Sequence, residues 1–472
     1  MSRTLNRYLI AFSILVMMAA LIAGVAGCVN NAHNVEIRTW YDLDAVRGNL
    51  TASYILVNDL DSAVAGYQEL AGPTANNGTG WQPIGSWDVP FAGSLDGRGH
   101  EVQDLFIDRP DEDHVGLFAA VNQSGTIKNI GVTNSTVIGQ DLVGSLAGLN
   151  SGTVSNSYAS GSVTGSSYHY HAGGLLGANQ GTVTNSYSTG SVTGGSNVGG
   201  LMGTSIGTVS SCGSSSDVIA TGDLVGGLVG VNDGAVTGSY STGNVIGDLG
   251  VGGLLGANGH SRPGTVSNCY STGSVTGVDS VGGLVGENQL DGVVSDSYSG
   301  GVVIGETYVG GLVGSNQAGN VSSSYSTGNV TGVESVGGLV GWNEAGDVSD
   351  CYSTGSVAGG SSVGGLAGVN AGTVSKSYSA SSVTGVDNVG GLVGENQLDG
   401  VVSNSFWDIE TSGKATSAGG TGKTAAEMRD MATFSDASWN ITTVADPGTR
   451  NPSYIWNIVN NATYPFQSWR AV

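Results

Sequence analysis

A glycine-leucine segment that recurs along most of the chain constrains the fold more than any other feature. The copy at residues 281–288 reads Val-Gly-Gly-Leu-Val-Gly-Glu-Asn. A fixed period of roughly 20 to 50 residues is typical of repeat proteins. Their units bury their apolar faces only by stacking on one another. The leucines of successive copies lie 26 to 30 residues apart, at Leu146, Leu175, Leu201, Leu228, Leu254, Leu284, Leu312, Leu339, Leu366 and Leu392.

Every repeat divides into short pieces of strand length. In the first complete copy the glycine-leucine run is followed by residues 153–158 and 162–165, with Gly or Asn between the pieces. No piece has helical spacing. We therefore predict an all-β fold, a parallel and right-handed β-solenoid of about a dozen coils with short helical or aromatic caps at both ends.

Asparagine occupies one fixed position in nine of the ten copies, four residues after the register leucine, and Ser205 is the exception. Coils that stack at the strand spacing of roughly 4.8 Å let each side-chain amide hydrogen-bond the next one. We predict a structural ladder made of Asn150, Asn179, Asn232, Asn258, Asn288, Asn316, Asn343, Asn370 and Asn396.

Two further columns concern the core. Stacked rings at the aromatic position, where Gly213 interrupts the column, would supply bulk to the interior. The residue before each ring is Ser or Cys, so Cys212, Cys269 and Cys351 share one column, two or three coils apart. That separation exceeds the roughly 7 Å that a disulfide allows between Cα atoms, so we expect no disulfide. The aromatic column comprises Tyr158, Tyr187, Tyr240, Tyr270, Tyr298, Tyr325, Tyr352, Tyr378 and Phe406.

Residues 1–27 have the pattern of a secretory signal. Arg3 and Arg7 precede an apolar run, and small residues stand before Cys28. The pattern also resembles the lipoprotein signal of bacteria and archaea, in which the cysteine becomes the lipidated first residue. This resemblance implies a lipid anchor on Cys28 and an extracellular protein held at the cell surface. The alternative is an uncleaved anchor helix, although the apolar run is barely long enough to span a membrane.

The charge balance excludes one class of partner. The chain has 14 basic and 37 acidic residues, and removal of residues 1–27 takes away two arginines and no acid, which leaves 12 minus 37, or −25. Nucleic acids are held largely by basic side chains on their phosphates, so we expect no nucleic-acid partner.

The segments outside the repeats differ from them in composition. Residues 28–140 contain a possible capping box at residues 39–42, and we interpret them as an N-terminal cap with irregular first coils. The solenoid proper takes residues 141–406. Residues 407–472 are rich in aromatic residues and carry a capping-box pattern at residues 424–427, which predicts a helix to about residue 432. We predict that they form a C-terminal cap over the last coil; the alternative is a carbohydrate-binding module.

The repeat resembles the GLUG motif. The shared pattern is Gly-Gly-Leu-Val-Gly-x-Asn, followed by Val-Ser-x-Ser-Tyr-Ser-Thr-Gly-x-Val-Thr-Gly. The motif occurs in surface and secreted proteins of bacteria and archaea, including immunoglobulin A-specific metalloendopeptidases. The resemblance implies a β-solenoid surface protein and brings no active site. The peptidases' His-Glu-x-x-His zinc site is not matched, because His100-Glu101 is followed by Asp104 where the second histidine is required. We therefore expect no catalysis.

Acidic residues precede the glycine-leucine strand in most coils. Like charges stacked one coil apart repel unless water or cations lie between them. Three interpretations stay open: splayed turn tips in water, calcium bridges between coils, and catalytic carboxylates of a polysaccharide-cleaving enzyme. Calcium is the cofactor that the acidic pattern suggests, with Asp223, Asp279, Glu334 and Asp387 as candidate ligands. The whole set is Asp141, Asp223, Asp248, Asp279, Glu306, Glu334 and Asp387.

The position after each register leucine is also apolar, as at Leu176, Met202 and Val229. Adjacent residues of a regular strand point to opposite faces. Either one of the two apolar ladders therefore lies outside and marks a partner surface, or the flanking glycines distort the strand and bury both.

Together these features favour a lipid-anchored protein of the cell surface with an adhesive or structural role. Its expected partners are the membrane, through the lipid, and cell-surface proteins or glycans. The alternative is a β-helix that binds or cleaves extracellular polysaccharide. Clustered acids and aromatic residues in a broken coil would be its signature.

Overall fold

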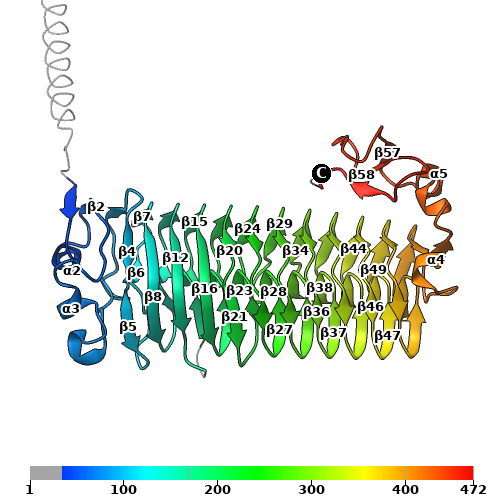
Figure 1. Cartoon of the computed structure of the whole chain (residues 1–472). Coiled ribbons are helices and arrows are strands. Elements are labelled where there is room, and N and C mark those ends of the chain that lie inside the picture. Colours follow the sequence, from blue (N-terminus) through cyan, green and yellow to red (C-terminus); the bar gives the residue numbers. More distant parts are fainter. Residues whose placement is uncertain (1–33, 168–169, 398, 471–472) are drawn as a thin grey trace, which may run out of the picture. The chain divides into compact units, whose positions relative to one another are not determined.

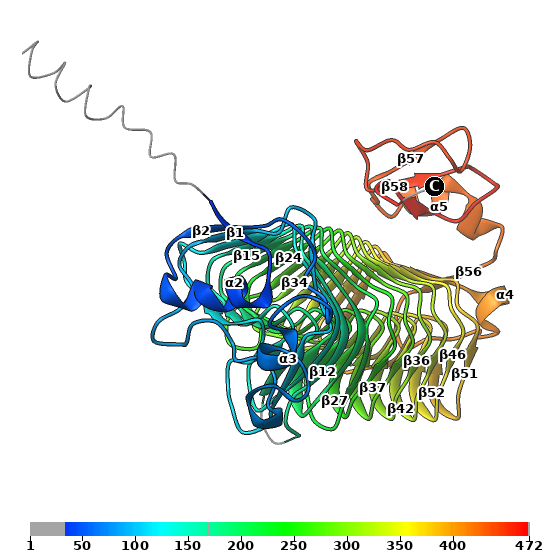
Figure 2. The ribbon, with the colours of Figure 1, turned by 60° about the vertical axis from the view of Figure 1, so that its left-hand side comes forward.

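The computed structural model describes residues 34–470 except 168–169 and 398, and Cys28 lies outside this range. Residues 36–472 form one compact unit (Figure 1). The predicted parallel β-solenoid is confirmed, and its handedness stays a prediction. One sheet takes a single strand from each of 11 consecutive coils, from β6 (Phe118–Val121) to β53 (Val393–Asn396). The successive coils can be followed along the stack in Figure 2.

A single coil contains five short strands instead of the three pieces expected. In the coil at residues 307–331 these are β37 (Thr307–Gly310), β38 (Val313–Asn316), β39 (Asn320–Ser322), β40 (Tyr325–Ser326) and β41 (Val330–Thr331). The glycine-leucine run contributes two strands because the chain turns at Gly311 and Leu312. The two strands belong to different sheets, and β38 pairs in parallel with β33 (Val285–Asn288) and β43 (Val340–Asn343).

This turn determines whether the two apolar ladders are buried or exposed. Leu312 lies at the corner and Val313 begins the next strand, and both are fully buried in the same core. The alternation rule applies within a strand and fails across a corner. The hypothesis of an exposed apolar stripe is therefore wrong, and both ladders stabilise the interior.

The prediction that the aromatic column fills the core is wrong as well. Ser326 follows Tyr325 on β40 and is fully buried, so the ring of Tyr325 points to the outer face. The rings stack on one another outside the coils, with centroids 5.1 Å apart for Tyr270 and Tyr298. Valine and leucine side chains supply the interior instead.

The Ser or Cys column forms an inward corner, as its small side chains indicate. The Ser324 hydroxyl donates to the Ser322 carbonyl oxygen at 2.7 Å, and the Cys351 thiol lies 3.1 Å from the Ser349 carbonyl oxygen. Either group therefore satisfies the carbonyl two residues earlier. Cys212, Cys269 and Cys351 are buried free thiols.

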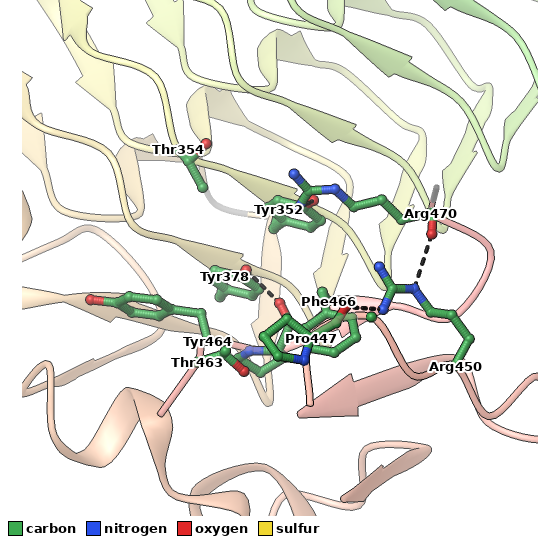
Figure 3. A pocket seen from close by; sticks show the side chains of 11 residues that line it. Tyr352, Thr354, Tyr378, Pro447, Arg450, Thr463, Tyr464, Phe466 and Arg470 are labelled. Carbon is green, nitrogen blue, oxygen red and sulfur yellow. Dashed lines mark hydrogen bonds between the residues drawn. The ribbon is translucent and has the colours of Figure 1, made fainter. Parts of the chain in front are cut away.

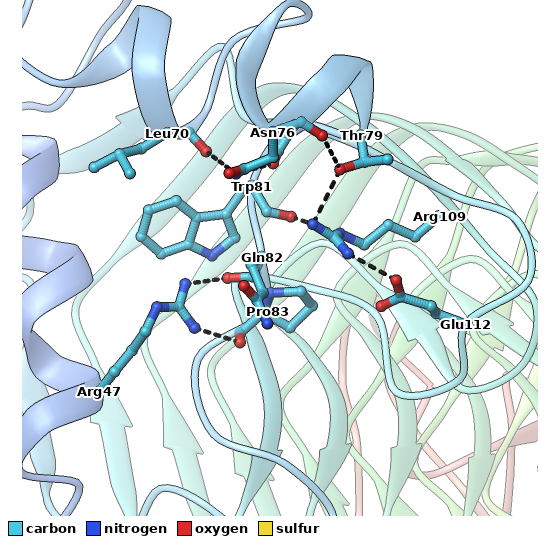
Figure 4. A network of polar contacts seen from close by, with 10 residues as sticks. Arg47, Leu70, Asn76, Thr79, Trp81, Gln82, Pro83, Arg109 and Glu112 are labelled. Atoms are coloured by element: carbon cyan, nitrogen blue, oxygen red, sulfur yellow. Dashed lines mark hydrogen bonds and ion pairs between the residues drawn. The ribbon is translucent and has the colours of Figure 1, made fainter.

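Residues 36–109 cover the N-terminal end of the stack. Thr39 and Asp42 form the predicted capping box at the start of α2 (Trp40–Asp44), which continues as a 3-10 turn, Ala45–Gly48; α3 (Tyr67–Leu70) is followed by a second such turn, Ala75–Gly78. Two arginines hold the segment before the first coil (Figure 4). Arg47 donates to the Pro83 carbonyl oxygen at 2.6 Å, and Arg109 donates to the Trp81 carbonyl oxygen at 3.0 Å.

Residues 409–423 cover the other end. After β55 (Phe406–Asp408) and α4 (Ile409–Ser412), the strand β56 (Thr421–Lys423) pairs in parallel with β55. The Ser417 hydroxyl accepts the Val393 N–H at 2.8 Å, and the Ala418 N–H donates to the Val393 carbonyl oxygen at 3.0 Å. These contacts occupy part of the open edge of the last coil, which would otherwise invite another strand.

The helix predicted from residue 424 is interrupted. Thr424 and Glu427 exchange the expected hydrogen bonds, but only a 3-10 turn, Glu427–Arg429, follows them. Asp430 takes an extended conformation and accepts the Ala432 N–H at 3.0 Å, so it caps a separate helix, α5 (Met431–Ser435). A second cap inside the segment breaks the helix, because a cap residue is not helical.

Candidate functional site

The seven acidic residues do not form one column. Asp279 and Glu334 occupy the same position, but Thr307 lies between them in the strand register, and Ser361 separates Glu334 from Asp387 in the same way. Carboxylates in this column are therefore two coils, roughly 10 Å, apart, which weakens their repulsion. Asp248 and Glu306 each stand one residue earlier in their coils.

This arrangement of the described acidic residues does not bring together a set of ligands for a metal ion. Within the described residues, no group of three or more His, Cys, Asp or Glu side chains is placed to hold a metal ion. Desolvation and the nearby Asp248 carboxylate raise the pKa of Asp223. His100, from the incomplete zinc motif, has its Nδ1 3.0 Å from Asp59 Oδ1. Calcium binding between coils stays a prediction of the sequence.

The asparagine column is a continuous buried ladder on both sides of Ser205. Asn316 Nδ2 donates to Asn343 Oδ1 at 2.8 Å and to the Gly319 carbonyl oxygen at 3.0 Å. Ser205 takes part through its hydroxyl, which accepts from Asn179 Nδ2 at 3.2 Å. Because the amides satisfy one another and their own turns, the column serves the fold and offers no free group to a ligand. The same bond between side-chain amides joins the pairs Asn150–Asn179, Asn232–Asn258, Asn258–Asn288, Asn288–Asn316, Asn343–Asn370 and Asn370–Asn396.

Two nearly identical repeats give a matched test of a partly buried carboxylate. Glu287 and Glu395 stand at the same place in segments 281–295 and 389–403. Burial and then the Asp279 carboxylate raise the pKa of Glu287. A raised carboxyl pKa means that the fold disfavours the charged form; this cost is full above the folded-state pKa and vanishes below the unfolded-state value.

We therefore expect Glu287→Gln to raise the Tm at pH 7 and to change it much less at pH 3.5. Thermal unfolding followed by circular dichroism at both pH values checks this. Glu395→Gln is the matched control, and its Tm should change less at pH 7. A lower Tm for Glu287→Gln at neutral pH would show instead that the carboxylate stabilises the fold.

The C-terminal segment, residues 424–470, packs on the last coil through Phe406 and extends along the flank of the solenoid to earlier coils. Its sheet contains β57 (Ile441–Thr443), β58 (Trp456–Ile458) and β59 (Phe466–Gln467). Trp456 Nε1 donates to Asp350 Oδ1 at 3.0 Å, and Trp469 Nε1 donates to the Ser323 carbonyl oxygen at 3.0 Å. The two acceptors are corner residues of adjacent coils, so the segment runs across several coils along the tyrosine column.

This placement divides the tyrosine column into two halves. Tyr352 and Tyr378 are 1% and 2% exposed beneath the segment, whereas Tyr187 and Tyr240 are 43% and 37% exposed outside it. Burial raises the pKa of Tyr325 to about 12 and that of Tyr352 further, so both hydroxyls stay protonated. The C-terminal segment thus covers one half of the tyrosine column and leaves the other half exposed to solvent.

A pocket of about 440 Å³ lies where the segment meets the coils (Figure 3). Arg450 lies over the Phe466 ring, with Cζ 4.5 Å from the ring centroid, and its Nε donates to the Arg470 carbonyl oxygen at 2.9 Å. Arg470 donates from Nη1 to the Tyr352 hydroxyl at 3.0 Å. The solenoid side of the pocket is formed by Tyr352, Tyr378 and the exposed Thr354.

Sequence reasoning missed this pocket. The density of aromatic residues near the C-terminus was visible, but nothing in their spacing pointed to Arg450 and Arg470. One usable signal was the presence of two arginines within 21 residues of a chain that has 14 basic residues in 472. The other half of the pocket comes from coils about 100 residues earlier, which only folding brings near.

Known proteins share the repeat. Matches to the model of the GLUG motif cover residues 139–164, 168–193, 247–276, 305–331 and 332–358. The chain contains five GLUG motifs. The resemblance inferred from the repeat is thus confirmed for these segments, and the GLUG repeats coincide with coils of the solenoid.

Two relatives match over part of the chain. Halomucin of Haloquadratum walsbyi is 37% identical over 137 residues, which are 28% of this chain and 1% of halomucin. A "Putative Gly-rich membrane protein" of Evansella cellulosilytica is 34% identical over 143 residues, 29% of this chain and 15% of that protein. The chain thus spans a small part of both relatives.

A crystal structure of "a putative immunoglobulin A1 protease" from Bacteroides ovatus aligns with a TM-score of 0.41 and 21% identity, over 52% of this chain and 76% of that one. Among the described residues, no helix is long and apolar enough to cross a membrane.

Proposed function

We propose that this protein is displayed outside the cell, anchored in the membrane by a lipid on Cys28, and acts as a structural or adhesive element of the cell surface without catalysis of its own. The lipoprotein-like pattern at residues 1–28 supports the anchor. The names of two relatives, halomucin and a Gly-rich membrane protein, support a place at the surface.

The observation that carries the proposed role is the regularity of the stack. From β23 (Val229–Asn232) to β53, every coil pairs with the next in the same register, and the asparagine ladder runs through it. An active site needs unlike groups that converge on one point. A stack of like coils instead presents the same outer side chains many times, which suits a spacer or a multivalent contact surface.

The anchor can be tested with the full chain in a bacterial host that processes lipoproteins. We expect the wild-type protein to incorporate a labelled fatty acid, to partition into detergent, and to be cleaved by protease added to intact, outer-membrane-free cells. Cys28→Ser should abolish the label and release the protein from the membrane fraction or leave its signal uncleaved. The loss should be essentially complete, because one residue carries the lipid.

Cys212→Ser is the matched control, since Cys212 is a buried thiol of the solenoid. It should leave the label and the membrane fraction unchanged. Labelling of Cys28→Ser at the wild-type level, or protection of the wild-type protein from external protease, would contradict the proposal.

A further inference from the structure

We propose that the pocket at Arg450 and Arg470 binds an acidic sugar residue of an extracellular polysaccharide, held through its carboxylate or sulfate group. This goes beyond the surface role, which needs no ligand pocket. The volume of about 440 Å³ falls within the usual range for small-ligand sites.

The charge of the pocket is the first argument. Arg47 and Arg109 in the N-terminal cap each pair with a carboxylate, Asp44 at 2.6 Å and Glu112 at 2.7 Å. Arg450 and Arg470 form no ion pair with any acidic side chain in the described part of the chain, although the protein carries a net charge of −23. Arg450 has the Asp446 carboxylate nearby without a direct ion pair, and Arg470 has tyrosine hydroxyls beside it, so both guanidinium groups can receive an anion from outside.

The guanidinium groups also have N–H donors that are not used in hydrogen bonds within the described part of the protein. Arg450 uses Nε and Nη1, and Arg470 uses Nη1, for the hydrogen bonds found among the described residues. Asp446 stands four residues before Arg450, but its carboxylate accepts the Gly448 N–H at 2.8 Å and the Thr449 hydroxyl at 2.9 Å. Arg450 thus retains Nη2, whereas Arg470 also hydrogen-bonds Tyr325. Planar guanidinium donors match carboxylate and sulfate oxygens well.

The rest of the lining fits a sugar ring better than an isolated ion. Tyr464 is the partly exposed aromatic residue of the lining, and its ring edge can contact the C–H groups of a sugar, whereas Tyr352 and Phe466 are only 1% and 7% exposed. The Thr463 hydroxyl oxygen accepts the Val459 N–H at 3.0 Å, which leaves its own hydrogen to donate. Sugar hydroxyls can use such a donor, so charge, an aromatic edge and a hydroxyl group are all present in one pocket.

The surface beside the pocket fits a polymer. Thr354 belongs to an outer column that continues through earlier coils, in which Thr327, Thr272 and Thr242 are also exposed. A glycan chain that leaves the pocket on this side meets a row of hydroxyl groups spaced by one coil, roughly 4.8 Å, except where Gly300 interrupts it. We therefore infer a polysaccharide and not a free sugar as the ligand.

The first experiment measures binding of residues 29–472 to defined polymers by calorimetry and by retention on coated beads. The probes are polygalacturonate and dextran sulfate, with methyl-esterified polygalacturonate and dextran as their neutral counterparts. Poly-L-glutamate supplies the same charge without a sugar. We expect at least one acidic glycan to bind, and the neutral polymers and the polypeptide to bind about tenfold more weakly or not at all.

Two kinds of variant locate the site. Arg450→Gln should weaken binding about tenfold, because it removes a charged donor, whereas Arg262→Gln makes the same charge change on an exposed loop and should have no effect. Thr354→Phe fills the pocket from an exposed position without removing any contact of the C-terminal segment. Thr276→Phe, at an exposed position on β31 (Val275–Thr276) outside this column, is its control and should leave binding unchanged. Unchanged Tm values show that each variant is folded.

Several results would overturn the proposal. Failure of both acidic glycans to bind the wild-type protein would exclude the ligand class. If poly-L-glutamate binds as tightly as the acidic glycans, the pocket recognises negative charge and not a sugar. Binding of Arg450→Gln and Thr354→Phe at the wild-type level would place the site elsewhere. None of these outcomes bears on the lipid anchor, because the experiment uses the chain without it.

Discussion

Replacement of Asn316 by leucine is expected to lower the free energy of unfolding by roughly 3 kcal/mol or more. Asn316 is fully buried, accepts from Asn288 Nδ2 at 2.8 Å and donates to Asn343 Oδ1 at 2.8 Å. Leucine has a similar size but no hydrogen-bonding group, so a buried donor on one coil and a buried acceptor on the other lose their partners. An unsatisfied buried polar group costs more than a hydrogen bond contributes.

Urea unfolding followed by tryptophan fluorescence measures the effect, because Trp342 lies on the neighbouring strand β43. Asn316→Ser is the matched control, since Ser205 takes part in the natural ladder through its hydroxyl. It should cost less than the leucine variant. Equal stability of Asn316→Leu and the wild type would mean that the amide ladder contributes nothing to the stack.

Replacement of Gly310 by alanine is expected to destabilise the solenoid by roughly 3 kcal/mol or more, and to lower the yield of folded protein. A Cβ at this position would lie 1.8 Å from the Val313 carbonyl oxygen and 2.7 Å from the Gly341 nitrogen of the next coil. Both are backbone atoms, one next to the corner between β37 and β38 and the other on β43 of the next coil, so no side chain can move aside. The corner must open to make room for the methyl group, and this opening breaks or lengthens the hydrogen bonds between neighbouring coils.

Gly300→Ala is the control for this prediction. Its added methyl group would meet nothing closer than 3.6 Å, at the Thr327 hydroxyl oxygen. Thermal unfolding by circular dichroism should place this variant near the wild type and Gly310→Ala far below it. A small change for Gly310→Ala, within about 1 kcal/mol, would show that the corner tolerates a wider turn.

The period of the chain made much of this architecture predictable. A register leucine every 26 to 30 residues implies stacked coils, and nine asparagines at one offset imply that they face one another across each step. Two properties of the coil were not visible in that pattern. The glycine-leucine run looks like one strand, and an aromatic column looks like core, because the position of a corner within the repeat leaves no signal in the period.

The pocket was beyond the sequence for a different reason. Arg470 meets Tyr352 across 118 residues, and Trp469 meets Ser323 across 146. No local rule links positions so far apart when one of them lies outside the repeat. The packing of the C-terminal segment along the tyrosine column, from Phe406 of the last coil to Tyr325, depends on the aromatic surface that it buries.

The sequence by itself determined the period, the parallel stacking and the amide ladder, because each is a relation between equivalent positions of similar units. Only the tertiary structure decided which columns face inward and where the C-terminal segment lies. Those outcomes depend on the angle of one glycine corner and on a contact between unlike segments, and neither is repeated along the chain.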